Sequence, residues 1–154
     1  HVARVTKVTK GGKTFSFSAL VVSGNPEAGQ VGLGLGKSRE VSLAIAKATN
    51  QARKNLITIA LRGTTLPYDV TGQHGASRVV IRPAYKGTGL IAGGAVRKIM
   101  EAAGVKDVLA KSLGSANAKN VAKATLNAFA QLRSASDLAK LRGRTVQELV
   151  GGSK

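Results

Sequence analysis

The chain has 154 residues, with 24 Lys and Arg side chains against 7 Asp and Glu, a formal net charge of +17. Because 43% of the residues are hydrophobic and 20% charged, a disordered basic tail is excluded, and we expect a folded protein that binds a polyanion. The absence of cysteine excludes disulfides, thiol nucleophiles and cysteine-based zinc sites. No segment approaches the ~18 consecutive apolar residues of a membrane span, and the first residues lack a signal-peptide pattern, so we expect a soluble intracellular protein.

The first residues predict a β-hairpin. Residues 2–10 are rich in β-branched and basic side chains and stop at Gly11 and Gly12, a dipeptide suited to a tight turn. A second strand follows, since apolar side chains alternate with serines along it. One face of this strand is formed by Phe15, Phe17, Ala19 and Val21.

A third strand and a helix complete the first third of the chain. In residues 31–35 glycine alternates with Val and Leu, so one face carries no side chains and we expect another element to pack close to it. A helix is predicted from Ser38, a candidate N-cap with Glu40 in the first turn. Its expected buried stripe is Val41, Ile45, Ala48, Ala52 and Leu56.

A break in the pattern at residues 62–65 predicts a boundary between two domains, residues 1–63 and 64–154. Residues 66–71 and 77–83 then predict a second hairpin. In its second strand, Val79 and Ile81 lie on one side. The cations Arg78 and Arg82 lie on the other.

The rest of the second domain alternates helix and strand. A glycine-rich turn at 87–94 leads to a helix closed by Gly104. Residues 108–113 predict a strand, 117–132 a helix and 137–150 a weaker helical tendency. The buried stripe expected for the first helix is Val96, Ile99, Met100 and Ala103, and for the second Val121, Thr125, Ala128 and Leu132.

One glycine-rich stretch resembles a nucleotide-binding loop but has the wrong spacing. The motif Gly36-Lys37-Ser38 ends like a phosphate-binding loop, yet the position five residues before Gly36 is Val31 and not glycine. The stretch therefore does not predict nucleotide binding. A helix N-terminus beside Lys37 and Arg39 nevertheless suits phosphate of any kind.

The sequence offers little that could support catalysis. Residues 87–92 fit a loose dinucleotide-binding pattern, but Asp107 precedes the next strand and does not end it. The two histidines are His1 and His74, the latter predicted to be a solvated turn residue, and the carboxylates are scattered. We therefore expect no enzymatic activity, no cofactor, no metal and no small-molecule substrate.

Basic side chains instead gather in the first domain. Three lysines flank the Gly11-Gly12 turn, and further cations, Lys47 among them, lie along the exposed side of the first helix. A β-β-β-α unit with a basic helix resembles the double-stranded RNA-binding domain, which favours RNA over DNA. The candidate RNA-binding residues are Arg4, Lys7, Lys10, Gly11, Gly12, Lys13, Lys37, Arg39, Arg53 and Lys54.

Four longer motifs lie along the chain: KGGKTFSF at residues 10–17, VGxGxGKxxEV at 31–41, GTGxIAGGAxR at 87–97 and LAKSLGSxNxxN at 109–120. With these motifs the whole chain resembles the bacterial-type fifth small-subunit ribosomal protein family. The resemblance implies an α+β protein of two small α/β domains. The N-terminal one would be a double-stranded-RNA-binding-like β-β-β-α unit, and the C-terminal one would contain a left-handed β-α-β crossover.

The same resemblance implies a structural ribosomal protein that binds small-subunit rRNA, supports assembly and decoding accuracy, and lies near the mRNA entry path. Residues 10–13 would form a loop near the head-body junction, where changes in this family are associated with spectinomycin resistance. Gly89 and Arg97 would face the fourth small-subunit protein, with the eighth as a further neighbour. A cytoplasmic ribosome is expected, with an organellar one as an alternative.

Two other functions remain open at this point. One is a free-standing chaperone or regulator of double-stranded RNA. The other is a small-molecule phosphotransferase that uses the C-terminal fold, against which the missing phosphate loop argues.

Overall fold

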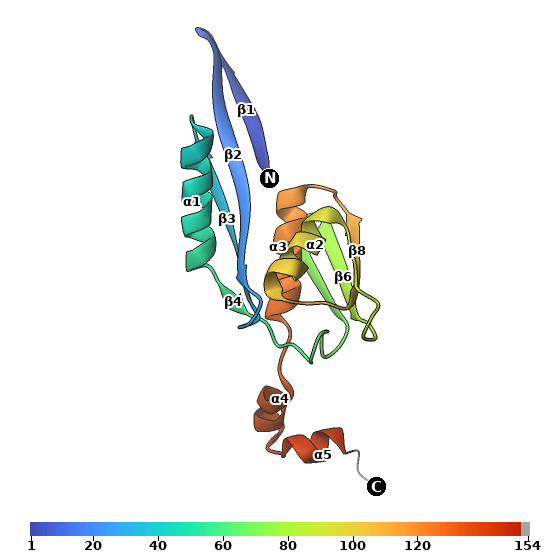
Figure 1. The fold of residues 1–154 in the computed structure, drawn as a ribbon. Helices are drawn as coiled ribbons and strands as arrows, with labels where there is room; N and C mark the ends of the chain where they lie inside the picture. The colour runs from blue at the N-terminus through green and yellow to red at the C-terminus, as the bar shows by residue number, and fades with distance from the viewer. Residues whose placement is uncertain (152–154) are drawn as a thin grey trace.

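The first sheet is formed by the N-terminal strands. The computed structural model describes residues 1–151 and shows an antiparallel sheet in the order β1-β2-β3-β4 with helix α1 on one face (Figure 1). The predicted strand-strand-strand-helix order is confirmed, and the short fourth strand is an addition. The elements are β1 (Val2–Thr9), β2 (Gly12–Asn25), β3 (Gln30–Ser38), α1 (Val41–Lys54) and β4 (Ile57–Thr58).

The second sheet is mixed, in the order β5-β6-β8-β7. Its last two strands are parallel and connected by α2, which makes a β-α-β unit. The α+β architecture is thus confirmed, while the left-handed sense of the crossover stays a prediction. The elements are β5 (Val70–His74), β6 (Ser77–Pro83), β7 (Leu90–Ile91), α2 (Gly94–Ala103), β8 (Val108–Gly114), α3 (Ala118–Ala130), α4 (Ala135–Arg142) and α5 (Val146–Val150).

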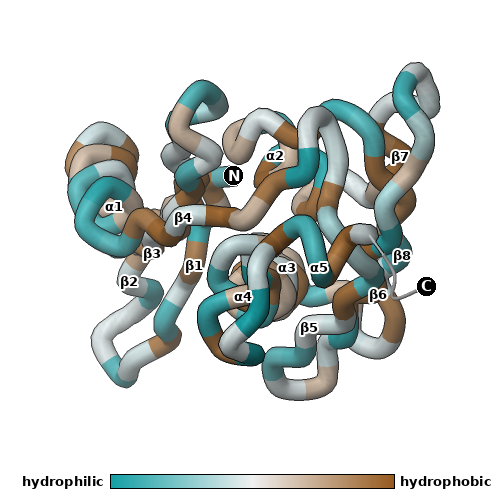
Figure 2. The backbone as a smooth tube through the Cα atoms, turned by 90° about the horizontal axis from the view of Figure 1, so that it is seen from below, coloured by the Kyte–Doolittle hydropathy of each residue, from teal (hydrophilic) through white to brown (hydrophobic). Residues whose placement is uncertain are grey.

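Helices α2 and α3 lie between the two sheets, so the first sheet is covered on both faces. Figure 2, which looks along the molecule from the tail end, shows α1 at one side, the first sheet next to it, α3 in the middle and the second sheet beyond. One hydrophobic cluster joins Val31 and Ile59 of the N-terminal part to Ile99, Val105 and Phe129 of the C-terminal part. The two predicted domains therefore share a core, and the boundary at residue 63 stays a prediction.

The glycine face of β3 packs against α1, as expected. Cβ atoms built on Gly32, Gly34 and Gly36 would overlap backbone atoms of the helix. The predicted buried stripe of α1 is partly wrong, because the buried residues are Ala44, Ala48 and Ala52, while Val41, Ile45 and Leu56 are 39–40% exposed. Small residues are buried here because helix and strand backbones approach closely.

Other predictions are corrected at element boundaries. The N-cap of α1 is Glu40, while Ser38 is the last residue of β3. The first strand of the second hairpin is Val70–His74 and not residues 66–71, so His74 ends a strand and is half-buried. The buried stripe of α2 and its left-handed C-cap at Gly104 are confirmed.

Candidate RNA-binding surface

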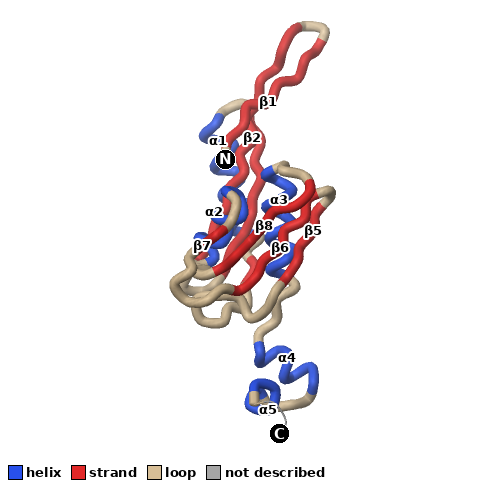
Figure 3. Tube along the Cα trace, turned by 90° about the vertical axis from the view of Figure 1, so that its right-hand side faces the viewer, coloured by secondary structure: helices blue, strands red, loops and turns tan. Residues whose placement is uncertain are grey.

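The hairpin of β1 and β2 projects beyond the rest of the molecule (Figure 3). Strand β3 ends at Ser38, which pairs with Phe17, so residues 12–16 of β2 pair with β1 alone. At about 3.4 Å per residue, this free section is roughly 17 Å long. At the turn, Gly12 has a φ of +127° and Thr9 Oγ1 donates to its carbonyl oxygen at 3.0 Å. A narrow two-stranded ribbon of this kind can reach phosphates that the rest of the molecule does not approach.

The register of the strands divides the hairpin's cations between its two faces. Paired residues on neighbouring strands point to the same face, so Arg4, paired with Phe17, and Lys13 lie on the α1 side. Lys7 lies on the opposite side, as does Lys37 of the neighbouring strand β3, and all four side chains are exposed. With Lys10 and Gly11 at the exposed tip, the hairpin presents positive charge in three directions.

The remaining candidate residues form two separate groups. Lys37 and Arg39 lie at the connection between β3 and α1, near the base of the free hairpin. Arg53 and Lys54 occupy the last turn of α1, which at 1.5 Å per residue places them about 20 Å away along the helix. Cations in a last helical turn also interact favourably with the helix dipole, so these two have a local structural role as well.

Few of the cations are neutralised within the protein. Among residues 1–151 the ion pairs are Arg82 with Asp69 at 3.4 Å and Arg97 with Glu101 at 3.2 Å, and neither involves a candidate RNA-binding residue. Other carboxylates bind hydroxyl or backbone groups at helix starts, as Asp137 and Glu148 do. The positive charge of the N-terminal part therefore has no close counter-charge, which favours a polyanionic partner.

The segment from Gly87 to Arg97 contains the two residues expected at a protein contact. Gly89 has a φ of +76°, a left-handed conformation that favours glycine. Its N–H and that of Gly87 both donate to Oδ1 of Asp107 at 3.0 Å. Arg97 is exposed on the first turn of α2 and pairs with Glu101.

Asp107 is a residue whose role sequence reasoning missed. It is 4% exposed, and its second carboxylate oxygen accepts a hydrogen bond from Thr64 Oγ1 at 2.7 Å. The hydrogen bond from Thr64, and then those from Gly89 and Gly87 and the charge of Lys86, lower the pKa of Asp107 although burial opposes them. The carboxylate ties the loop at residues 87–89 to Thr64, in the segment between β4 and β5. In the sequence, the only indication of this role is a glycine-rich loop followed by a lone acidic residue.

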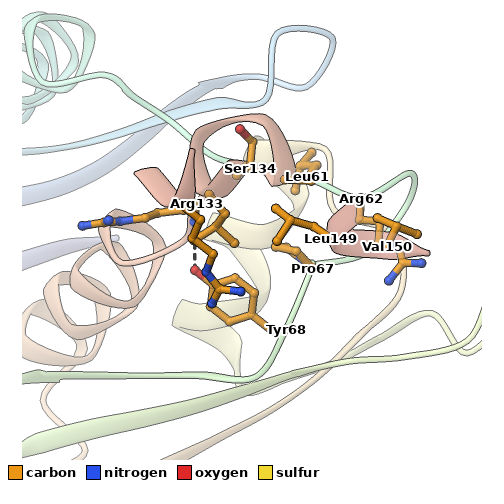
Figure 4. A pocket seen from close by; sticks show the side chains of 12 residues that line it. Leu61, Arg62, Pro67, Tyr68, Arg133, Ser134, Leu149 and Val150 are labelled. Atoms are coloured by element: carbon orange, nitrogen blue, oxygen red, sulfur yellow. Dashed lines mark hydrogen bonds between the residues drawn. The ribbon is translucent and has the colours of Figure 1, made fainter. Parts of the chain in front are cut away.

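A groove of about 570 Å³ lies where the C-terminal tail, which contains α4 and α5, meets the segment between β4 and β5 (Figure 4). Its walls are mainly apolar and include Leu61, Pro67 and Leu149. The Tyr68 hydroxyl accepts from the backbone N–H of Arg133 at 2.9 Å and donates to the carbonyl oxygen of Gln131 at 3.1 Å. These contacts hold the start of the tail against the body, and no candidate RNA-binding residue lines the groove.

Within residues 1–151 no group of three or more His, Cys, Asp or Glu side chains could hold a metal ion. No helix in the same range is long and apolar enough to cross a membrane.

Comparison with known proteins matches both halves of the chain. Residues 1–60 match the family model described as Ribosomal protein S5, N-terminal domain, and residues 72–142 match that of Ribosomal protein S5, C-terminal domain. A protein of Chromohalobacter salexigens named Small ribosomal subunit protein uS5 is 52% identical over 151 residues, 98% of this chain and 90% of the relative. One of Koribacter versatilis with the same name is 53% identical over 148 residues, 96% of this chain and 88% of the relative. The chain therefore belongs to the ribosomal protein S5 family.

Proposed function

We propose that this chain is a structural protein of the small ribosomal subunit that binds rRNA mainly through the projecting hairpin of β1 and β2. The observation that carries the proposal is the concentration of unneutralised cations on this hairpin, which extends roughly 17 Å beyond β3. A solvated charged face would be interspersed with acids. In this chain the first acidic residue is Glu27, beyond the whole hairpin.

The cations on the two hairpin faces suit phosphates on two sides of a groove or junction. Arg4 and Lys13 would contact one backbone, and Lys7 and Lys37 the other. Gly11 and Gly12 carry no side chains, so their backbone N–H groups, beside Lys10, can approach phosphate closely. Arg39 extends this surface toward α1, while Arg53 and Lys54 form a second contact at the far end of the helix.

The finer assignments rest on the family resemblance. Gly89 and Arg97 would face the fourth small-subunit protein, and the eighth would be a further neighbour. The chain would act near the mRNA entry path of a cytoplasmic ribosome, with an organellar one as the alternative. Its contribution there would be non-catalytic, since it holds RNA segments and a protein neighbour in register and so supports assembly and decoding accuracy. The rigid loop held by Asp107 supports this proposal, because a fixed surface suits docking.

The salt dependence of rRNA binding tests the hairpin's role. Affinity falls with salt, so the plot of log affinity against log salt concentration has a negative slope. Removing one phosphate contact should make this slope less negative by roughly 0.7 to 0.9. Lys10→Gln and Lys13→Gln should each produce this change, and Lys106→Gln, an exposed lysine before β8, is the matched control that should not. Unchanged slopes in both hairpin variants would contradict the proposed surface.

Sucrose-gradient fractionation tests the ribosomal assignment. We expect the tagged chain to sediment with small-subunit particles and to remain there at moderate salt. A free-standing RNA chaperone would instead stay near the top of the gradient.

A further inference from the structure

The α1 side of the hairpin carries an exposed aromatic ring. Phe15 is 47% exposed and belongs to neither hydrophobic cluster. Phe17, two residues along the same face, packs against Ala44 and Ala48 of α1. Phe15 lies two residues farther toward the tip, beyond the last pair between β2 and β3. The ring therefore offers apolar surface that a ligand could bury.

The guanidinium of Arg4 lies over this ring. Its carbon atom Cζ lies 5.0 Å from the centroid of the Phe15 ring, within the range of a cation–π interaction. In the strand register Arg4 is opposite Phe17, so its side chain reaches diagonally toward the tip to cover Phe15. Lys13 lies two residues from Phe15 on the same face. An aromatic ring, a planar guanidinium and an ammonium group thus lie on one face of the projecting ribbon.

We propose that Arg4 and Phe15 form a stacking site for one unpaired nucleobase of RNA. Aromatic rings and arginine planes are the groups on which splayed-out bases stack, and a neighbouring lysine can neutralise the adjoining phosphate. The site would bind a bulged or single-stranded nucleotide, whereas a double-stranded RNA-binding domain contacts duplex phosphates and 2′-hydroxyls. The inference rests on the proposed function, because it assumes that the hairpin binds RNA.

The surroundings of Phe15 favour a nucleobase over an apolar protein surface. The centres of protein interfaces are depleted in charged residues, whereas Phe15 lies among Arg4, Lys13 and, at the tip, Lys10. No acidic residue occurs in the first 26 positions of the chain. A nucleotide offers both partners at once, since its base can pack on the ring and its phosphate can neutralise the cations.

The experiment compares two RNA stem-loops with the full-length chain. They are identical except that one carries a single bulged purine, and the ratio of their affinities isolates the contribution of the unpaired base. Phe15→Leu should weaken binding of the bulged RNA about five- to 100-fold with little effect on the paired RNA, since stacking of one base has that magnitude. Its salt slope should stay at the wild-type value, because no cation is removed.

Two variants serve as controls. Phe15→Tyr keeps the ring and should bind the bulged RNA as the wild type does. Val5→Ala removes an exposed apolar side chain from the opposite face of the hairpin and should change neither affinity. In NMR spectra of the complex with bulged RNA, the ring protons of Phe15 should shift relative to the free protein, because a base packs beside the ring and the guanidinium that lies over it.

Each other outcome overturns the stacking site. Wild-type affinity of Phe15→Leu for the bulged RNA would do so, as would an equal loss for both RNAs, which would show that Phe15 only shapes the hairpin. If Lys10→Gln and Lys13→Gln still make the salt slope less negative in that case, the proposed function stands and only the stacking site fails. If neither lysine variant alters RNA binding, the proposed RNA-binding role of the hairpin is itself wrong, and the stacking site is rejected with it.

Discussion

Replacing Gly34 with alanine tests the packing of the first sheet. A Cβ at this position would lie 2.6 Å from the backbone nitrogen of Ala52 and closer still to the carbonyl oxygen of Ala48. Carbon atoms in ordinary contact are about 3.5 to 4.0 Å from their neighbours, so α1 must retreat by at least about 1 Å. Backbone atoms of a helix cannot rotate away as a side chain can.

The expected cost follows from the contacts that this retreat weakens. Helix α1 buries Ala44, Ala48 and Ala52 against β2 and β3, and a gap of about 1 Å forfeits up to half of each dispersion contact. We expect a loss of at least about 3 kcal/mol in the free energy of unfolding, the upper end for overpacked cores. For a chain of this size that is a fall in Tm of roughly 6 to 12 °C.

Thermal and urea unfolding followed by circular dichroism measure this change. Gly11→Ala is the matched control, because a Cβ there meets nothing within 4 Å and its stability should stay within about 0.5 kcal/mol of wild type. If Gly34→Ala melted like the control, the close approach of α1 and β3 would be wrong.

Three further predictions concern the C-terminal half. Asp107→Asn should destabilise the loop at residues 87–89. Because folding lowers the pKa of Asp107, its carboxylate stabilises the folded protein above pH ~4, and this stabilisation is lost as the pH falls toward the folded-state pKa. The variant should therefore lose less stability on acidification than the wild type. Gly89→Arg, at a φ of +76° and with open space around its Cβ, should alter misreading in a reporter assay and leave assembly largely intact, and wild-type error rates would refute this. Phe129→Ala, at a fully buried position, should cost about 3 to 5 kcal/mol in urea unfolding, and a smaller loss would show that the core collapses around the cavity.

The pattern of large apolar side chains predicted α2 better than α1. In α2 the buried residues are the large ones, so helical spacing identifies Val96, Ile99 and Met100 directly. In α1 the partner is a strand without side chains, and the buried positions are alanines. Helical spacing of large apolar residues therefore wrongly predicts Val41 and Ile45 as core, because the glycine face of β3 leaves room only for small helix residues. The two-residue strands β4 and β7 are too short for a periodic signal.

The candidate site was predictable to the extent that it depends on local geometry. The hairpin turn and the lysines around it follow from Gly11-Gly12 and its flanking strands. The role of Asp107 depends on the approach of residues 64, 87 and 89, which are 43, 20 and 18 positions away, and no local pattern specifies that approach. The position of Arg4 over Phe15 likewise requires the register between β1 and β2.

Strand β2 connects the proposed RNA contact with the proposed protein contact. It runs without interruption from Gly12 at the hairpin tip to Asn25, about 45 Å at 3.4 Å per residue. At its far end, a Cβ on Gly24 would overlap the carbonyl oxygen of Ala102 in α2, and the adjoining Pro26 lies against Gly104. Helix α2 carries Arg97 on its first turn. Because β2 is packed tightly against α2 at Gly24, a displacement of β2 that reaches this end should also move α2. Substitutions at the hairpin tip and around Gly89 should therefore affect each other's RNA-binding and accuracy phenotypes, and strictly additive effects in double variants would show that the two ends act independently.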